Sequence, residues 1–279
     1  MTVLVGFLAG CAAGYGGWLM LRPTFAAEIF QRQNHRGLSV PTAVGLILPL
    51  AVLASETALA LAEALDWEPN AVTDGPRAAV LILALGLGLL GLLDDLAGEG
   101  ESGGFSGHLR ALRHGRFTTG SLKLFGGAAV AIVAVQGPRS DSLGRVVLDA
   151  AVIALCANAA NLFDRAPGRT VKVSLFAFLV LVAATGAPAE LLAVAVVAGA
   201  AAGLLWPDLR EQMMLGDVGA NVLGGVIGLG VVIATAPTTR TIVLLGVLAL
   251  NLASEAVSFS QVIDKVPPLR ALDRAGRKP

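Results

Sequence analysis

The chain has 279 residues, of which 55% are apolar and only 14% charged, and its mean hydropathy is +0.75. Soluble domains carry about 25% charged residues, so this composition excludes a disordered chain, a coiled coil and a nucleic-acid-binding protein with a basic surface. It favours a polytopic membrane protein. Because Lys plus Arg and Asp plus Glu both number 20, only the positions of the charges are informative.

The apolar segments are typical of membrane-spanning helices. About 20 apolar residues in a helix cross the hydrocarbon core of a bilayer. The runs are continuous rather than alternating, which excludes strands as the spanning elements. We therefore expect an all-α, polytopic transmembrane helix bundle over residues 1–257, followed by a basic tail over residues 258–279. The nine expected spans are 2–21, 40–62, 77–97, 120–136, 143–162, 170–187, 188–206, 216–236 and 239–257.

The first apolar segment is expected to be a span rather than a lipoprotein signal. The run Leu8-Ala9-Gly10-Cys11 resembles a lipoprotein cleavage box, but no basic residue precedes it and the apolar stretch continues to Leu21. Glycines at four-residue intervals in this segment (Gly6, Gly10, Gly14) and in the eighth (Gly224, Gly228) are typical of closely packed membrane helices.

The basic residues predict the orientation of the bundle. Sixteen of the 20 Lys and Arg residues fall in one set of alternating loops, and four, namely Arg77, Arg139, Arg145 and Arg240, fall in the other. The positive-inside rule places the richer set in the cytoplasm. The N-terminus is then outside and the C-terminal tail inside, which agrees with an odd number of spans.

Polar residues gather at the predicted cytoplasmic ends of several spans. Carboxylates and amides at one membrane depth are costly unless they are paired, hydrated or bound to a cation. Oxygen ligands without His or Cys suit Mg²⁺, which usually shares its coordination shell with a substrate phosphate. The sequence therefore predicts a cytoplasm-facing site for Mg²⁺-assisted phosphate chemistry. The residues are Asp94 and Asp95 at the end of the third span, Lys123 at the start of the fourth, Asn158, Asn161 and Asp164 at the end of the fifth, and Asp217 at the start of the eighth.

Each of these residues also has a simpler interpretation. The Asp94–Asp95 pair could be solvated at a helix end, and Asn158 could form a hydrogen bond between helices. Asp217 could cap a helix, and Lys123 could be a basic anchor at the membrane surface. The arrival of acids from three spans at one face favours a site.

Three motifs, in this order and spacing, resemble those of the polyprenyl-phosphate N-acetylhexosamine-1-phosphate transferases, which include phospho-MurNAc-pentapeptide translocase. They are Gly91-Leu-Leu-Asp94-Asp95, Asn158-Ala-Ala-Asn161-Leu-Phe-Asp164 and Gly216-Asp217-Val-Gly219. The segment Arg36-Gly37-Leu-Ser-Val-Pro41-Thr42 also resembles the first cytoplasmic loop of that family. The similarity extends from about residue 32 to residue 230.

The resemblance implies an enzyme of the plasma (inner) membrane with its active site facing the cytoplasm. A nucleotide sugar, usually a UDP-N-acetylhexosamine, would give its sugar phosphate to a polyprenyl phosphate for cell-envelope synthesis, with Mg²⁺ as cofactor and Mn²⁺ as a substitute. Asp217 and Asn161 would hold the metal, Asp94 or Asp95 would orient or deprotonate the lipid phosphate, Lys123 would neutralise phosphate charge, and Asp164 would be an essential acid. The nucleotide sugar would meet Asn158, Arg165, Arg169, Arg270 and Arg274. A homodimer is left open.

The chain also departs from the family pattern. The motif that ends at Asp164 usually continues as Asp-Gly-x-Asp-Gly, but here it reads Asp164-Arg165-Ala166-Pro167-Gly168, so Pro167 replaces the second acid. The His-rich motif of the last cytoplasmic loop and the usual tenth span are both missing. Arginines of the tail are expected to replace the histidines by binding diphosphate, or else to anchor the tail to lipid headgroups. The alternatives to an enzyme are a non-catalytic relative that binds lipid phosphate or scaffolds an envelope assembly, and a transporter.

Overall fold

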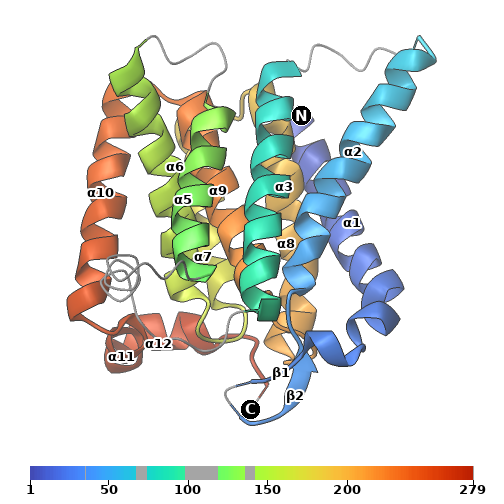
Figure 1. Ribbon diagram of the computed structural model, residues 1–279, viewed down its shortest axis with the longest axis vertical. Helices are drawn as coiled ribbons and strands as arrows, with labels where there is room; N and C mark the ends of the chain where they lie inside the picture. Colours follow the sequence, from blue (N-terminus) through green and yellow to red (C-terminus); the bar gives the residue numbers. More distant parts are fainter. Residues whose placement is uncertain (35, 67–73, 98–118, 136–141, 279) are drawn as a thin grey trace.

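The computed structural model describes residues 1–34, 36–66, 74–97, 119–135 and 142–278. In these ranges the protein is a bundle of helices that run roughly along the long axis of the molecule (Figure 1). The expected all-helical bundle is therefore confirmed. Its long helices are α1 (Thr2–Phe25), α2 (Ile47–Ala64), α3 (Asp74–Ala97), α5 (Thr119–Ala134), α6 (Leu143–Phe163), α7 (Arg169–Thr185), α8 (Leu192–Leu209), α9 (Gly216–Ala234) and α10 (Pro237–Ala256).

Each predicted span coincides with one of these helices, but the helices differ in length. Within the described residues, seven helical segments are long and apolar enough to cross a membrane, which makes the chain a multi-pass membrane protein by length and composition. The other two, α5 and α7, have 16 and 17 residues. The nine-span count and the orientation of the bundle therefore stay predictions.

The second predicted span begins later than expected. Residues Gln31–Gln33 (β1) and Ser39–Pro41 (β2) form a two-stranded antiparallel hairpin, and a short 3₁₀ helix, η2 (Val44–Leu46), precedes α2. Pro41 has no amide hydrogen to continue a helix, and Ala43 has the left-handed φ of 58°. The prediction of a helix from residue 40 was therefore wrong by seven residues, and these residues instead form a compact loop at the lower end of the bundle (Figure 1).

Glycines allow the closest helix contacts, as their spacing predicted. A Cβ atom on Gly10 would lie 2.8 Å from the carbonyl carbon of Val196 in α8, and one on Gly203 of α8 would lie 2.7 Å from the backbone nitrogen of Tyr15 in α1. Glycines of both helices thus let the α1 and α8 backbones touch. Gly224 of α9 likewise faces α6, where its Cβ would lie 2.6 Å from the Cβ of Ala160. Such contacts supply van der Waals energy where lipid provides no hydrophobic drive.

Helix α9 forms the centre of the bundle. Of the most apolar 18-residue stretch of α9, 83% is buried inside the protein, whereas the figure for α10 is 6%. The N-terminus of α9 therefore meets surrounding helices on several sides, and an acid at that end is partly shielded from solvent. The residues Gly216 and Asp217 open this central helix.

The basic residues that begin α3, α6 and α10 lie at the upper end of the bundle and are neutralised by acids (Figure 1). The Arg240 guanidinium lies 2.8 Å from Asp149, which also pairs with Arg145 at 2.8 Å. Arg77 lies 2.8 Å from Glu56. The described members of the larger basic set belong to segments at the other, lower end.

Candidate active site at the lower end of the bundle

The acids of α3 reach the start of α9 because two glycines remove the side chains that would separate the helices. A Cβ on Gly91 would lie 2.6 Å from both the nitrogen and the Cα of Val218. At the start of α9, Gly216 has a φ of +73°, and a Cβ there would lie 2.5 Å from Asp95 Oδ2. The glycines in the first and third motifs therefore have a shared structural purpose, which is to bring the end of α3 against the N-terminus of α9.

Asp95 uses this proximity to cap α9. Its Oδ1 accepts a hydrogen bond from the Asp217 amide at 3.0 Å, and its Oδ2 accepts one from the Val218 amide at 3.1 Å. These amides belong to the first turn of the helix, where no intrahelical acceptor exists, and a carboxylate there also complements the helix dipole. Arg32 in turn donates to the carbonyls of Asp95 and Leu96 at 3.2 Å. Asp95 is thus a cap between two helices.

Asp94 points instead to a polar cluster, which we call the Lys123 cluster and define as Asp94, Lys123, Asn161 and Asp217. The Lys123 ammonium lies 3.3 Å from Asp94 Oδ2 and forms a very short contact with Asp217 Oδ2. With its amide oriented to satisfy both neighbours, Asn161 donates to Asp217 Oδ1 at 2.7 Å and accepts from Lys123 Nζ at 3.2 Å. Four different helices, α3, α5, α6 and α9, therefore meet at one ammonium group.

The oxygen donors of the Lys123 cluster match the chemistry that Mg²⁺ requires. Among the described residues, no group of three or more His, Cys, Asp or Glu side chains is arranged to hold a metal by itself. Two carboxylates and one amide oxygen nevertheless surround Lys123, and all three are hard ligands. Asp217 and Asn161 would be the residues that hold such an ion, and Lys123 would then be free to contact a phosphate.

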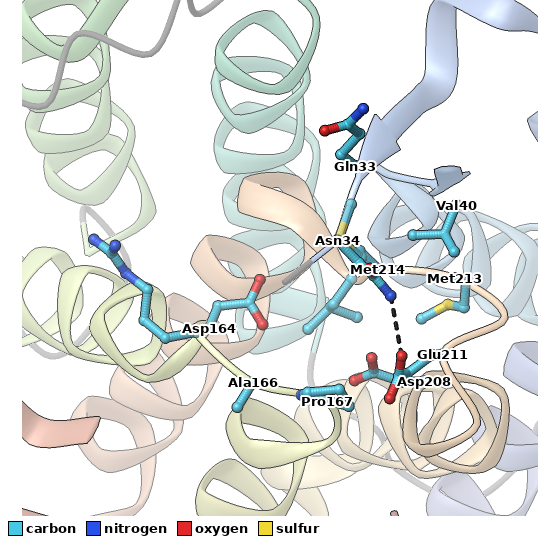
Figure 2. A pocket seen from close by; sticks show the side chains of 12 residues that line it. Gln33, Asn34, Val40, Asp164, Ala166, Pro167, Asp208, Glu211, Met213 and Met214 are labelled. Carbon is cyan, nitrogen blue, oxygen red and sulfur yellow. Dashed lines mark hydrogen bonds between the residues drawn. The ribbon is translucent and has the colours of Figure 1, made fainter. Parts of the chain in front are cut away.

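Asp164 ends α6 and faces a separate cavity beside the cluster. A pocket of about 170 Å³ opens between the β1–β2 hairpin, the loop after α6 and the segment after α8 (Figure 2). Burial raises the pKa of Asp164 well above its ordinary value, and the negative charges of Asp208 and Asp217 raise it further. The Asp164 carboxyl is therefore poised to bind a proton, a hydrogen-bond donor or a cation. The pocket is lined by Gln33, Asn34, Val40, Asp164, Arg165, Ala166, Pro167, Asp208, Glu211, Met213, Met214 and Leu215.

Two further acids of this pocket were missed by the sequence analysis. Asp208, at the end of α8, is buried and accepts a hydrogen bond from the Gly168 amide at 2.9 Å. Glu211 accepts from Asn34 at 3.0 Å and pairs with Arg36 at 3.1 Å. Asp208 lies two residues beyond the predicted span 188–206, so the criterion that selected Asp94, an acid at a cytoplasmic helix end, applies to it equally.

The three polar residues at the C-terminal end of α6, Asn158, Asn161 and the cap residue Asp164, do not act as one group. Asn158 donates to Asn251 of α10 at 2.5 Å, whereas Asn161 joins the Lys123 cluster and Asp164 faces the pocket. Three-residue steps in an α-helix drift by about 60° each, so a difference of six residues turns Asn158 well away from Asp164. This contact corresponds to the simpler interpretation of Asn158 as a hydrogen-bonding residue between helices, and its predicted role in nucleotide-sugar binding stays untested.

The predicted nucleotide-binding arginines occupy three different environments. Arg165 is exposed and lines the pocket. Arg169, at the start of α7, is buried, and its guanidinium is engaged by Asp273 at 2.8 Å and by Ser260 at 2.8 Å. Arg270 is exposed, and Arg274 pairs with Asp264 at 3.3 Å on the surface of the tail. Only Arg165 of this set therefore lines the pocket. The three histidines, His35, His108 and His114, lie outside the described residues.

No family model matches this chain, and no curated protein matches it either. The transferase resemblance therefore depends on the motifs and on the geometry that brings their residues together.

Proposed function

We propose that the protein transfers a sugar 1-phosphate from a nucleotide sugar to a polyprenyl phosphate at the cytoplasmic face of the plasma membrane. The observation that carries this proposal is the Lys123 cluster, in which one residue from each of the three motifs meets a lysine near the start of α5. Two carboxylates, an amide and a lysine gathered at one membrane depth are costly, and such groups usually mark a functional site. Phosphoryl transfer needs such a concentration of mobile positive charge and metal-binding oxygens.

The reaction exchanges one phosphorus–oxygen bond for another. An oxygen of the lipid phosphate forms a bond to the phosphorus that carries the sugar, and the bond from that phosphorus to the nucleoside monophosphate breaks. The products are a lipid-linked sugar diphosphate and, for a UDP-sugar, UMP. In this scheme Asp217 and Asn161 would hold Mg²⁺, which neutralises diphosphate charge when it is bound.

The geometry supports different roles for the two neighbouring acids. Both carboxylate oxygens of Asp95 accept backbone amides of α9, so Asp95 positions Asp217. Asp94 faces Lys123 at 3.3 Å and is the better candidate to orient or deprotonate the lipid phosphate. Lys123 would then bind the lipid phosphate, because an ammonium held by two carboxylates can exchange one of them for a phosphate oxygen.

The pocket beside the cluster is the natural place for the nucleotide end of the donor. It is lined by Asp164 and by the loop that contains Pro167. Pro167 offers no amide hydrogen, so contacts to the base must come from side chains and from other backbone groups. The charge bias of the loops supports a cytoplasmic position for this end of the bundle, and nucleotide sugars are made in the cytoplasm.

The second candidate function is a non-catalytic protein that binds lipid phosphate. The replacement of an acid by Pro167 in the nucleotide loop favours it. Under this alternative, Lys123 would bind a lipid phosphate and no nucleotide sugar would be turned over.

A reconstituted transfer assay separates these candidates. The protein in nanodiscs would be incubated with radiolabelled undecaprenyl phosphate, Mg²⁺ or Mn²⁺, and a panel of UDP-, CDP- and GDP-sugars. We expect metal-dependent formation of lipid-linked product, and its loss in Asp217→Asn, because an amide is a poorer ligand for a hard cation than a carboxylate. The matched control is Asp264→Asn, which removes an exposed carboxylate of the tail. Lipid-phosphate binding without product for any donor would support the non-catalytic alternative, and full activity of Asp217→Asn would reduce Asp217 to a structural residue.

A further inference from the structure

The C-terminal tail crosses the lower end of the bundle rather than leaving it. After α10 the chain forms two short helices, α11 (Phe259–Lys265) and α12 (Pro267–Arg274) (Figure 1). The carbonyl of Lys278 accepts a hydrogen bond from Arg36, beside the β1–β2 hairpin, at 3.2 Å. This path brings the tail to the loop of residues 164–168, which we call the pocket loop. The loop lines the pocket through residues 164–167.

A buried ion pair connects the tail to the end of the pocket loop. The Arg169 guanidinium donates from Nε to Asp273 Oδ1 at 2.8 Å and from Nη2 to Oδ2 at 3.0 Å. The side chains of Arg169 and Asp273 are only 6% and 5% exposed. Arg277 adds a third donor to Asp273 Oδ1 at 2.5 Å. A bidentate, buried pair of this kind has a defined geometry, and removal of one partner leaves an uncompensated charge.

Further contacts fix the backbone on both sides of this pair. Arg277 Nε donates to the carbonyl of Pro167 at 3.0 Å, which is a direct contact with the pocket loop. Lys172 donates to the carbonyls of Asp273 at 2.9 Å and Ala275 at 2.6 Å at the end of α12. The amide of Lys278 donates to the carbonyl of Leu209 at 3.3 Å, at the end of α8. The tail is thus fastened to α7, α8 and the pocket loop.

We propose that Asp273 is a positioning residue that holds the pocket loop, through Arg169 and Arg277, in the conformation that receives the nucleotide sugar. This inference rests on the proposed function for its substrate, and on the hydrogen bonds of Asp273, Arg169 and Arg277 for its mechanics. Asp208 holds the loop from one side at the Gly168 amide, and the tail holds it from the other side at Pro167 and Arg169. Without the tail, the loop would lose its contacts at Pro167 and Arg169 and would sample other conformations.

The test compares three tail variants of the full-length protein in nanodiscs. Asp273→Asn removes the charge that Arg169 and Arg277 share, Asp273→Glu keeps that charge, and Asp264→Asn removes the exposed carboxylate paired with Arg274. Hydrogen exchange of amides in residues 164–170 reports on the loop directly. We expect exchange about tenfold faster in Asp273→Asn than in the unmodified protein, which corresponds to about 1.4 kcal/mol, with partial rescue in Asp273→Glu and no change in Asp264→Asn.

Transfer kinetics provide the second readout. A misplaced loop weakens donor binding, so KM for the nucleotide sugar should rise about tenfold in Asp273→Asn while kcat stays within about twofold. A tail that merely stabilised the fold would lower the active fraction, and hence kcat, without changing KM. Unchanged loop exchange, or faster exchange with unchanged KM, would overturn the positioning role.

If Asp273→Asn does not fold, Arg277→Gln, which removes the donor to Pro167 but leaves the Arg169–Asp273 pair, should also accelerate loop exchange, and failure to do so would overturn the inference. If the unmodified protein turns over no nucleotide sugar, the proposed function fails, and loop exchange alone then decides whether the tail holds the loop.

Discussion

Replacing Gly91 with alanine should separate α3 from α9 and weaken the arrangement of the site. The added Cβ would lie 2.6 Å from the nitrogen and Cα of Val218, whereas carbon atoms in contact prefer about 3.5–4.0 Å. One of the two helices must therefore move by about 1 Å. Because the obstacle is backbone rather than a flexible side chain, rotamer changes cannot relieve it.

The expected cost follows from three contributions. Alanine in place of glycine favours the helix by about 1 kcal/mol, and overpacking costs about 1–3 kcal/mol. The same movement stretches the two hydrogen bonds from the α9 amides to the Asp95 carboxylate, each worth about 1.5–3 kcal/mol. The net loss in the free energy of unfolding should be roughly 3 kcal/mol or more when these principles are combined.

Thermal unfolding followed by tryptophan fluorescence in detergent measures this loss. At about 2–4 °C per kcal/mol, the midpoint of Gly91→Ala should fall by at least about 6 °C. The matched control is Gly127→Ala in α5, whose added Cβ would find only Leu87 Cδ2 at 3.8 Å, and which should unfold at or slightly above the temperature of the unmodified protein. Equal midpoints for the two variants would refute the close-approach argument.

Three other predictions concern orientation, pH and donor choice. A reporter fused after Pro279 should be cytoplasmic and one inserted near Asp141 external, because of the basic bias of the loops. Burial raises the pKa of Asp273, but Arg169 and Arg277 more than offset this and hold it below its ordinary value. Ionised Asp273 should therefore stabilise the fold fully above about pH 3.9, and this stabilisation should be lost as the pH falls through the lower pKa of the folded state. Unfolding of Asp273→Asn and of the unmodified protein, measured as a function of pH, would show this loss. Calorimetry with UDP-, CDP- and GDP-sugars should show weak discrimination among bases, because Pro167 provides no amide for a base contact.

Each of these predictions has a contrary outcome. Reversed reporter positions would place the Lys123 cluster outside the cell, away from nucleotide sugars. A stability difference between Asp273→Asn and the unmodified protein that persisted unchanged far below pH 3.9 would mean that the charge of Asp273 does not matter. A strong preference for the uridine compound would show that the base is recognised without the amide that Pro167 lacks.

The sequence by itself was sufficient to locate the helices and the end of the bundle where chemistry is expected. Long apolar runs have few alternatives to a helix in lipid, because every backbone polar group must be satisfied within the segment. The four-residue glycine spacing correctly identified close contacts of α1 and α9. Acids and an amide at the ends of apolar runs predicted that Asp94, Asn161 and Asp217 would share one membrane depth, and the structure brings them together around Lys123.

Only the tertiary structure decided which of these residues face each other. Asp94 and Asp95 are adjacent and chemically identical, and they differ because the Asp95 carboxylate meets the free amides of α9 while Asp94 meets Lys123. Arg169 was predicted to meet the nucleotide, but the returning tail places Asp273 against it. Hydropathy fixes depth in the membrane, whereas the rotation of each helix and the docking of a tail depend on contacts between segments distant in sequence. Those contacts bring the ends of four helices together around Lys123, next to the pocket that Asp164 lines.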